Sequence, residues 1–397
     1  MAKVTAQLLS LDAKGTLAKK MTFQNRKGTN TVYWNKGHSD NPSEASEIQR
    51  TWFREATQAW KELTDEQKQT YKDRAKAIKN EDITGYNLYI REYPEAPPEP
   101  IYEWSEQQPA GVANKVWEKC QISDDGKSAI AVASWDHVYI YRNGAWEQHK
   151  PAGASTKDWQ ACAISGDGKI AIAAYDYGKI YKYNGTDWNE EQPAGATTKR
   201  WYTLALNYDG TKMIAGVNSG RLYYHNGISW AEQQPEGASN RAWTMVGISA
   251  TGDKLIACIN GYHVYTYING SWARNSPTGA RNQSWTMAKI SDDGNKYIAG
   301  IWNGKLYHYT GTEWIEDQPL GNTNKGWKDG QINEDGNKYI VCVQGGRIYY
   351  YNGTEWQEEQ PAGDADKTWY GVDISADGEK RIAGIAPGRL YARLQTN

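Results

Sequence analysis

A 42-residue repeat organises most of this chain. Residues 356–397 hold its clearest copy, which begins WQEEQPAG, continues WYGVDISADGEKRIAGIA and ends PGRLYARLQTN. The opening Trp recurs with this step at Trp104, Trp146, Trp188, Trp230, Trp272, Trp314 and Trp356. A second Trp recurs with the same step at Trp117, Trp159, Trp201, Trp243, Trp285, Trp327 and Trp369. Seven copies fill residues 104–397 without insertion, and a fixed period of this length dictates the architecture of a chain.

Each repeat predicts four short antiparallel strands. In the last copies these strands are expected within residues 369–375, 380–386, 346–353 and 354–360. Apolar residues alternate in the first strand, and Asp-Gly turns such as Asp377-Gly378 separate the first strand from the second. Asn352-Gly353 predicts a two-residue hairpin, because both central residues of that turn need positive φ. The pattern therefore describes one four-stranded sheet for every copy.

Seven such sheets predict a mainly β fold, a seven-bladed β-propeller of 42-residue blades. One four-stranded sheet cannot bury both of its faces, whereas sheets packed radially cover one another. The Ile-Ala-small pattern of the second strand suits the crowded zone between blades. The last copy stops after its third strand, and Ile101–Gln107 aligns with the missing fourth. We therefore expect a propeller over residues 101–397 that strand 101–107 closes, which would leave no free sheet edge.

The repeat also resembles known propeller families. The pattern W…ISxDGxKxIAG…GxLYxY over residues 101–397 is similar to the repeats of WD40-type and sialidase-type propellers. The Trp-Asp and Gly-His pairs of WD40 repeats are absent. The hairpin YNGTEW is a shortened relative of the sialidase Asp-box turn and lacks its Ser-x-Asp-x-Gly spacing. The resemblance therefore implies a fold and no particular activity.

The region before the repeats predicts a small α+β domain over residues 1–93. Residues 1–36 are basic, and residues 15–34 alternate weakly, which indicates a hairpin that turns at Lys27-Gly28. Helical spacing begins near Ser43, and Thr64 is expected to cap a second helix. A third helix or an extended tail is expected at Ile83–Tyr93. Residues 94–100, PEAPPEP, form a Pro-rich linker, which is expected to act as a semi-rigid spacer.

Residues 15–93 also resemble small modules encoded by tailed phages and prophages. Those modules run from a basic hairpin through Pro-x-Ser-x-Ala, Q-R-x-x-F and W-x-x-L-T-x-x-x-K-x-x-Y to TGYNLY. The matching positions are Pro42, Gln49, Arg50, Phe53, Trp60, Leu63, Thr64, Lys68, Tyr71, Gly85 and Tyr86. The resemblance implies a virion-associated role, in which residues 1–93 attach to a capsid or tail protein. A generic three-helix core is the alternative.

Composition narrows the classes of function. The formal net charge of −2 gives no reason to expect specific nucleic-acid binding. The sequence has no apolar run long enough to predict a membrane span and no recognisable secretion signal. The six His residues show no metal-ligand spacing, so we expect neither a metal nor another cofactor. The nearly uniform repeats also lack a nucleophile, a base and an oxyanion donor in one blade, so we expect no enzyme.

The candidate binding residues are a Trp and two basic positions in each repeat. The second Trp series, Trp117, Trp159, Trp201, Trp243, Trp285, Trp327 and Trp369, could offer platforms for sugar faces or cations. Basic residues lie two positions before that Trp at Lys157, Lys199, Arg241, Lys325 and Lys367, and at the start of the third strand at Arg221 and Arg347. Together they predict a site for a glycan or an anionic polymer on one face. The structural alternative is that the Trp residues wedge between sheets and the basic residues pair with Glu106, Glu190, Glu232, Glu316 and Glu358.

These features favour a non-enzymatic structural or decoration protein on the virion surface of a tailed phage. In this hypothesis the N-terminal domain docks on the particle, which assembles in the host cytoplasm, and the propeller binds a host-surface glycan. The alternatives are a free propeller lectin and a propeller that acts as a protein-interaction scaffold. The sequence leaves oligomerisation open.

Overall fold

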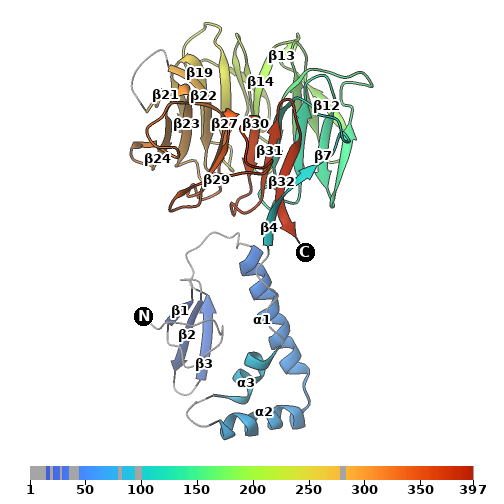
Figure 1. Ribbon diagram of the computed structural model, residues 1–397, viewed down its shortest axis with the longest axis vertical. Helices are drawn as coiled ribbons and strands as arrows, with labels where there is room; N and C mark the ends of the chain where they lie inside the picture. Colours follow the sequence, from blue (N-terminus) through green and yellow to red (C-terminus); the bar gives the residue numbers. More distant parts are fainter. Residues whose placement is uncertain are drawn as a thin grey trace. The chain divides into compact units, whose positions relative to one another are not determined.

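The computed structural model describes residues 15–17, 21–26, 29–34, 44–78, 83–93, 101–277 and 283–396 (Figure 1). The chain forms two compact units, Met1–Ile101 and Tyr102–Asn397. The expected turn at Lys27-Gly28 and the expected linker at 94–100 lie outside the described residues. None of the helices in the described ranges has the length and the apolar character needed to cross a membrane.

The first unit begins with a three-stranded antiparallel sheet in the order β1 (Gly15–Leu17), β2 (Met21–Arg26) and β3 (Thr29–Trp34). In the β2–β3 pair, Arg26 lies opposite Thr29 and Met21 lies opposite Trp34. The weak alternation in the sequence therefore corresponds to a real hairpin with an additional short strand, β1.

Three helices complete the first unit: α1 (Glu44–Glu62), α2 (Asp65–Ala77) and α3 (Gly85–Glu92). Thr64 caps α2 as predicted, because its side chain accepts from the Gln67 backbone N–H while the Gln67 side chain accepts from the Thr64 N–H. Trp60 of α1 contacts Tyr86 and Tyr89 of α3, with ring centroids 5.5 and 5.3 Å apart. This aromatic cluster joins α1 to α3, which also buries Leu88 and Ile90.

The second unit is built from four-stranded antiparallel sheets that repeat along the chain. The first three run β5 (Trp117–Ile122), β6 (Ala129–Ala133), β7 (Val138–Arg142), β8 (Ala145–His149); β9 (Trp159–Ile164), β10 (Ala171–Tyr175), β11 (Ile180–Tyr183), β12 (Trp188–Glu191); and β14 (Trp201–Leu206), β15 (Met213–Val217), β16 (Leu222–His225), β17 (Trp230–Gln233). A short strand, β13 (Pro193–Ala196), packs beside β16 and β17.

The next sheets follow the same order. They run β18 (Trp243–Ile248), β19 (Leu255–Tyr262), β20 (Val264–Ile268), β21 (Ser271–Arg274); β22 (Gln283–Ile290), β23 (Tyr297–Gly304), β24 (Leu306–Tyr309), β25 (Trp314–Asp317); and β26 (Lys325–Ile332), β27 (Tyr339–Gly346), β28 (Ile348–Tyr351), β29 (Trp356–Glu359). The remaining sheet has the order β30 (Lys367–Ile374), β31 (Arg381–Ile385), β32 (Leu390–Thr396) and β4 (Ile101–Gln107). As expected, the strand before the repeats lies beside the C-terminal strand.

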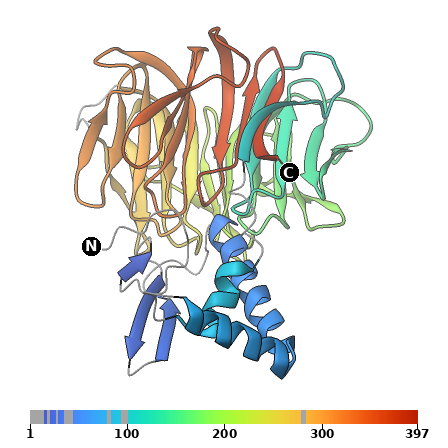
Figure 2. The ribbon, with the colours of Figure 1, turned by 60° about the horizontal axis from the view of Figure 1, so that its bottom comes forward.

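We call the first strand of each sheet its inner strand: β5, β9, β14, β18, β22, β26 and β30. Each inner strand packs against the inner strand of the next sheet, and β30 packs against β5. Figure 2 shows the sheets standing side by side. Backbone bridges also join neighbouring sheets, as in Gly178↔Lys199 and Gly220↔Arg241, and Lys115↔Gly388 joins the two sheets that contain β5 and β30.

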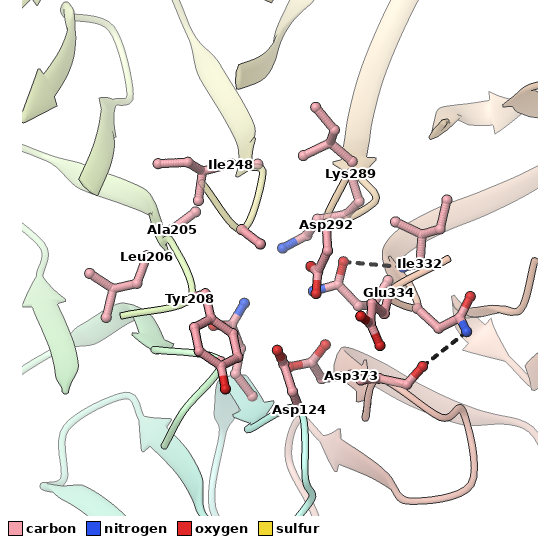
Figure 3. Close-up of a pocket in the computed structure, with 18 of the residues that line it drawn as sticks. Asp124, Ala205, Leu206, Tyr208, Ile248, Lys289, Asp292, Ile332, Glu334 and Asp373 are labelled. Atoms are coloured by element: carbon pink, nitrogen blue, oxygen red, sulfur yellow. Dashed lines mark hydrogen bonds between the residues drawn. The ribbon is translucent and has the colours of Figure 1, made fainter. Parts of the chain in front are cut away.

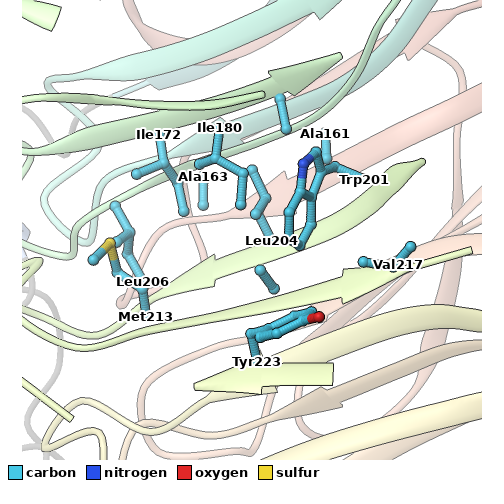
Figure 4. Close-up of a cluster of buried hydrophobic side chains, with 12 residues drawn as sticks. Ala161, Ala163, Ile172, Ile180, Trp201, Leu204, Leu206, Met213, Val217 and Tyr223 are labelled. Carbon is cyan, nitrogen blue, oxygen red and sulfur yellow. The ribbon is translucent and has the colours of Figure 1, made fainter. Parts of the chain in front are cut away.

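The hydrophobic core lies between neighbouring sheets. Figure 4 shows one cluster, in which Trp201 and Leu204 of β14 pack with Ile172 of β10 and Ile180 of β11. The small residue of the second strand belongs to this layer, as the sequence predicts. A Cβ added to Gly300 of β23 would lie 2.9 Å from the Cβ of Trp327 in the next sheet. The Trp of one sheet therefore needs a small residue in the sheet beside it.

The Asp-Gly turns are stabilised by their own side chains. Ser123 Oγ donates to Asp125 Oδ1 over 2.7 Å, and the Lys127 N–H donates to the same oxygen over 2.9 Å. Gly126 has φ +68°, a conformation that glycine adopts without steric cost. The carboxylate of the turn is therefore a capping group.

The expected two-residue hairpin at Asn352-Gly353 is wrong. β28 ends at Tyr351 and β29 begins at Trp356, so four residues form the loop. Asn352 Oδ1 accepts from the backbone N–H groups of residues 354 and 355, which builds an Asx turn instead. The two-residue form occurs at Asn143-Gly144, where both φ angles are positive, because that pair lies one position later in its repeat.

We predict that Gly85→Ala destabilises the first unit. An added Cβ would lie 2.6 Å from the backbone nitrogen of Lys72, so α3 would have to move away from α2. The expected loss is about 1–3 kcal/mol in the unfolding free energy of this unit, the range for forced overpacking. Hydrogen exchange of the α2 and α3 amides measures it, and Glu55→Ala on the exposed face of α1 is the control. Unchanged exchange in both variants would contradict the packing of α3 on α2.

Candidate functional site

The predicted Trp platform is buried. The residues concerned are Trp117, Trp159, Trp201, Trp243, Trp285, Trp327 and Trp369, and each is at most 3 % exposed. Trp159 Nε1 donates to the Asp136 carbonyl of the neighbouring sheet over 3.1 Å, and Trp327 Nε1 donates equivalently to Gly304. A sugar or cation in solvent cannot reach these rings. The expectation of an exposed aromatic platform is therefore corrected in favour of the structural alternative.

The basic residues at the start of the third strand pair with carboxylates of their own sheet. Arg221 lies 3.5 Å from Glu232, and Arg347 lies 3.6 Å from Glu358. The same contact joins Lys179 to Glu190, Lys305 to Glu316 and Arg389 to Glu106. These are the pairs that the structural alternative predicts. Arg347 also pairs with Asp364 and Asp366, over 2.8 and 2.7 Å, so its charge is more than matched.

The other basic series marks the junctions between sheets. Backbone pairing with the preceding sheet holds Lys157, Lys199, Arg241, Lys325 and Lys367. The Arg241 guanidinium lies 4.4 Å from the Tyr262 ring centroid, and Lys157 Nζ donates to Ser155 Oγ over 2.8 Å. All five side chains are half-buried. They are spread over separate junctions, so the structure does not bring the predicted site together.

The charged groups that do converge lie on the inner strands, at positions outside the predicted site. Two positions after the repeat Trp, most copies hold a small or apolar residue, but Lys119 and Asp329 occur there; four positions after it, Lys289 and Asp373 stand out. These four residues are at most 9 % exposed. These four residues differ from the residues at the same positions of the other repeats, and a comparison of the repeats at those positions would have identified them.

The buried charges are partly matched. Lys119 Nζ lies 2.6 Å from Asp329 Oδ1, and Asp329 Oδ2 accepts from the Val372 N–H. Burial lowers the pKa of Lys119, but the neighbouring Asp329 carboxylate offsets this effect, so the pKa is raised overall. Burial, together with the charge of Lys119, lowers the pKa of Lys289 to about 8. Unpaired buried charge is costly, so this layer is a specific feature of the molecule.

At one end of the inner strands, three carboxylates face a common recess of about 80 Å³. We call this the carboxylate end and define it by Asp124, Asp292, Glu334 and Tyr208 (Figure 3). Each follows the end of an inner strand, where other copies carry Gly166, Ala250 and Ala376. Burial and the charges of its neighbours, Asp292 first, raise the pKa of Asp124 to about 8. Burial and Glu334 raise the pKa of Asp292 to about 6.

The start of the inner strands lines a second recess of about 60 Å³. We call this the tyrosine end. It is lined by Glu118, Gln160, Tyr202, Thr244, Thr286, Lys328 and Tyr370. Lys328 Nζ lies 4.2 Å from the Tyr370 ring centroid, and Ser134 Oγ donates to Glu118 over 2.8 Å. Six strand residues separate the two ends, which corresponds to about 20 Å.

Each end of the inner strands offers a recess whose side chains could bind a ligand. Among the described residues, no group of three or more His, Cys, Asp or Glu side chains is arranged to hold a metal ion. None of the described residues that line the two recesses is a histidine. The tyrosine end combines aromatic faces with hydroxyl, amide and charged groups, and the carboxylate end combines negative charge with an aliphatic wall.

The four-stranded sheets and their packing define a mainly β, propeller-like repeat protein. The chain is similar to the structure of YCF48 from Cyanidioschyzon merolae, with a TM-score of 0.54 and 16 % identity over 73 % of this chain and 98 % of that one. It is also similar to YCF48 bound to D1 peptide, with a TM-score of 0.56 and 13 % identity over 76 % and 97 % of the two chains. No family model matches the sequence, and neither does any curated protein. At this level of identity the similarity shows the fold.

We predict that Asp124→Asn stabilises the protein at pH 8. The pKa of Asp124 is raised from the ordinary value of 3.8 to about 8 in the folded protein. Between these two pH values the folded protein therefore keeps a proton on Asp124 that the unfolded chain has lost. The contribution of the Asp124 carboxyl to the free energy of unfolding is fully present below pH 3.8, where the group is protonated in both states. This contribution is lost as the pH rises toward 8, because the buried group must then ionise. The variant avoids that loss and should be more stable by about 1–3 kcal/mol at pH 8.

Urea unfolding at pH 5 and pH 8 measures the effect, which should be smaller at pH 5. Asp187→Asn, at an exposed carboxylate in the β11–β12 loop, is the control and should show no such pH dependence. Equal stability of Asp124→Asn and wild type at both pH values would contradict the burial of a charged carboxylate at this end.

Proposed function

We propose that the sheets form a closed seven-bladed propeller. Three kinds of contact support this proposal, because each recurs between sheets along the chain and again between its two ends. The first is the backbone bridge Lys115↔Gly388 described above. In the second, Trp230 Nε1 donates to Glu191 over 2.8 Å, and Trp104 Nε1 donates likewise to Glu359. In the third, Lys254 Nζ donates to the carbonyl of residue 293, and Lys380 Nζ to that of residue 125.

Closure predicts that Trp104→Phe and Trp230→Phe are equally harmful. Both substitutions keep an aromatic ring and remove one indole donor to a carboxylate, which corresponds to about 1–3 kcal/mol. Equilibrium unfolding of the two variants measures the loss. An open assembly would give a loss for Trp230→Phe alone, because Trp104 would then contribute to no junction between sheets.

The protein that we propose is non-enzymatic and binds a host-surface glycan through the tyrosine end. One observation carries this proposal: the repeat is nearly constant where it builds the sheets, but its copies hold unlike polar and aromatic residues at this end. Tyr202 and Tyr370 offer faces for sugar C–H groups, while Gln160, Glu118 and Lys328 offer donors and acceptors. Different side chains around one recess can hold a ligand in a single orientation, whereas identical side chains would not distinguish one orientation from another.

The N-terminal unit, in this proposal, attaches the propeller to the surface of a tailed-phage virion. The resemblance of residues 15–93 to phage modules supports this role, and Trp60, Tyr71 and Tyr86 of that pattern meet in one aromatic cluster. A protein-interaction scaffold is the second candidate. It is favoured by the solved complex of YCF48 with D1 peptide, in which a protein of this fold is bound to a peptide.

The glycan proposal predicts that the full-length chain binds sugars on a glycan array. Tyr202→Ala and Tyr370→Ala should each weaken binding about tenfold, since loss of an aromatic platform removes contacts of roughly 1–2 kcal/mol. Tyr208→Ala, which removes an exposed tyrosine from the carboxylate end, is the matched control and should bind normally. Failure to bind any glycan would favour the scaffold.

Co-sedimentation with assembled phage particles tests the attachment separately. A chain that binds sugar but never sediments with particles is a free lectin, and the virion role is then wrong.

A further inference from the structure

The carboxylate end carries more negative charge than the protein neutralises. Asp124, Asp292 and Glu334 come from three different sheets and face one recess, which Asp373 of β30 also lines (Figure 3). Their charges act on one another, because Asp292, Glu334 and Asp373 each contribute to the raised pKa of Asp124. Lys289 is the one cationic side chain among the described residues that line this recess.

A second, independent observation indicates a missing partner. Asp373 is 3 % exposed, and its Oδ2 accepts from the Ile122 N–H over 2.8 Å. Its other oxygen, Oδ1, is buried and has no hydrogen-bond partner among the described residues. A buried carboxylate oxygen without a donor is costly, and a donor that enters the recess would remove that cost.

The wall of the recess restricts the chemistry of that donor. An aliphatic belt surrounds the recess, with one residue from every inner strand: Ile122, Ile164, Leu206, Ile248, Ile290, Ile332 and Ile374. Tyr208 lies at the rim and is 43 % exposed. The belt suits an apolar stem, and the carboxylates suit a cationic head that carries several donors. The lack of a preformed group of three metal ligands in the described residues argues against a bare divalent ion.

We propose that the carboxylate end binds an arginine side chain presented by a protein partner. Arginine combines a methylene stem with a planar guanidinium whose five donors can serve two carboxylates at once. Asp124 and Asp292 receive the guanidinium, Glu334 adds to the negative potential, and the stem lies against the aliphatic belt and Tyr208. This site is about 20 Å from the tyrosine end and is independent of the proposed glycan binding.

Arginine binding is coupled to proton release. Burial, together with the charges of Asp292, Glu334, Asp373 and the neighbouring Asp125, raises the pKa of Asp124 and holds its proton in the empty recess, and the Tyr208 phenol lies beside it. A bound guanidinium favours the ionised carboxylates and expels that proton. Lys289 is cationic below its pKa of about 8, and its charge acts on Asp373, whose pKa burial raises and Lys289 lowers. Among the described residues that line this recess, one cation faces four carboxyl groups, so a second cation can still be accommodated.

Isothermal titration calorimetry of the full chain with the capped tripeptide Gly-Arg-Gly tests the proposal, and Gly-Gln-Gly is the neutral control peptide. Titrations at pH 7 in two buffers of different ionisation enthalpy report the released proton. We expect binding of the arginine peptide alone, with proton release. Asp124→Asn combined with Asp292→Asn should weaken binding at least tenfold, and Asp187→Asn should leave it unchanged.

Two results would overturn the proposal: equal affinity for the two peptides, or full affinity in the double variant. Calcium binding that the double variant abolishes, without any arginine binding, would also overturn it and assign the recess to a metal ion. If the double variant fails to fold, Glu334→Gln at the same rim replaces it and should weaken binding at least threefold. Neither the presence nor the absence of glycan binding affects these outcomes.

Discussion

The tryptophan at the start of each repeat's inner strand packs between its own sheet and the sheet before it, and the rest of the second unit depends on this contact. Trp201 meets Ile172 and Ile180 of the preceding sheet, and Trp117 meets Ile382 and Leu390 in the same way. A four-stranded sheet alone exposes two faces, so each sheet is stable only beside its neighbours. The tryptophans that the sequence predicted as ligand-binding residues are therefore the core residues that hold the sheets together.

Two kinds of position follow from this constraint. Residues that contact the next sheet are almost the same in every copy, because every junction has the same shape. The residues that line the recesses at the two ends of the inner strands differ from copy to copy, although some of them, such as Thr244, also contact the next sheet. Glu118 and Tyr202 at one end, and Asp124 and Tyr208 at the other, occupy equivalent places with unlike chemistry. Specific recognition in a repeat protein of this kind is therefore expected where the repetition fails.

Within the second unit, the sequence predicted the positions that repeat and missed the charged residues in which the copies differ. Spacing located the strands, the small residue beside Trp327, the Thr64 cap and the pairing of strand 101–107. It could not show that the inner strands are buried against one another, because alternation of apolar residues does not identify which strand of a sheet packs against the neighbouring sheets. Lys119 and Asp373, which are both buried, were therefore not singled out. The Asn352 turn was misjudged for a related reason, because a shift of one residue exchanges a hairpin for an Asx turn.

The pairing of β4 with β32 constrains the order in which the molecule can be built. The sheet that contains β30, β31 and β32 takes its fourth strand from residues 101–107, which leave the ribosome long before residues 390–396 exist. Strand β4 therefore remains unpaired, with exposed backbone hydrogen-bonding groups, until β32 has been synthesised. Its late docking makes the last step of folding a contact between distant parts of the chain, which is a slow class of folding event. A chain that ends anywhere before β32 would leave β4 without its pairing strand, and such an unpaired edge is a template for association with another chain.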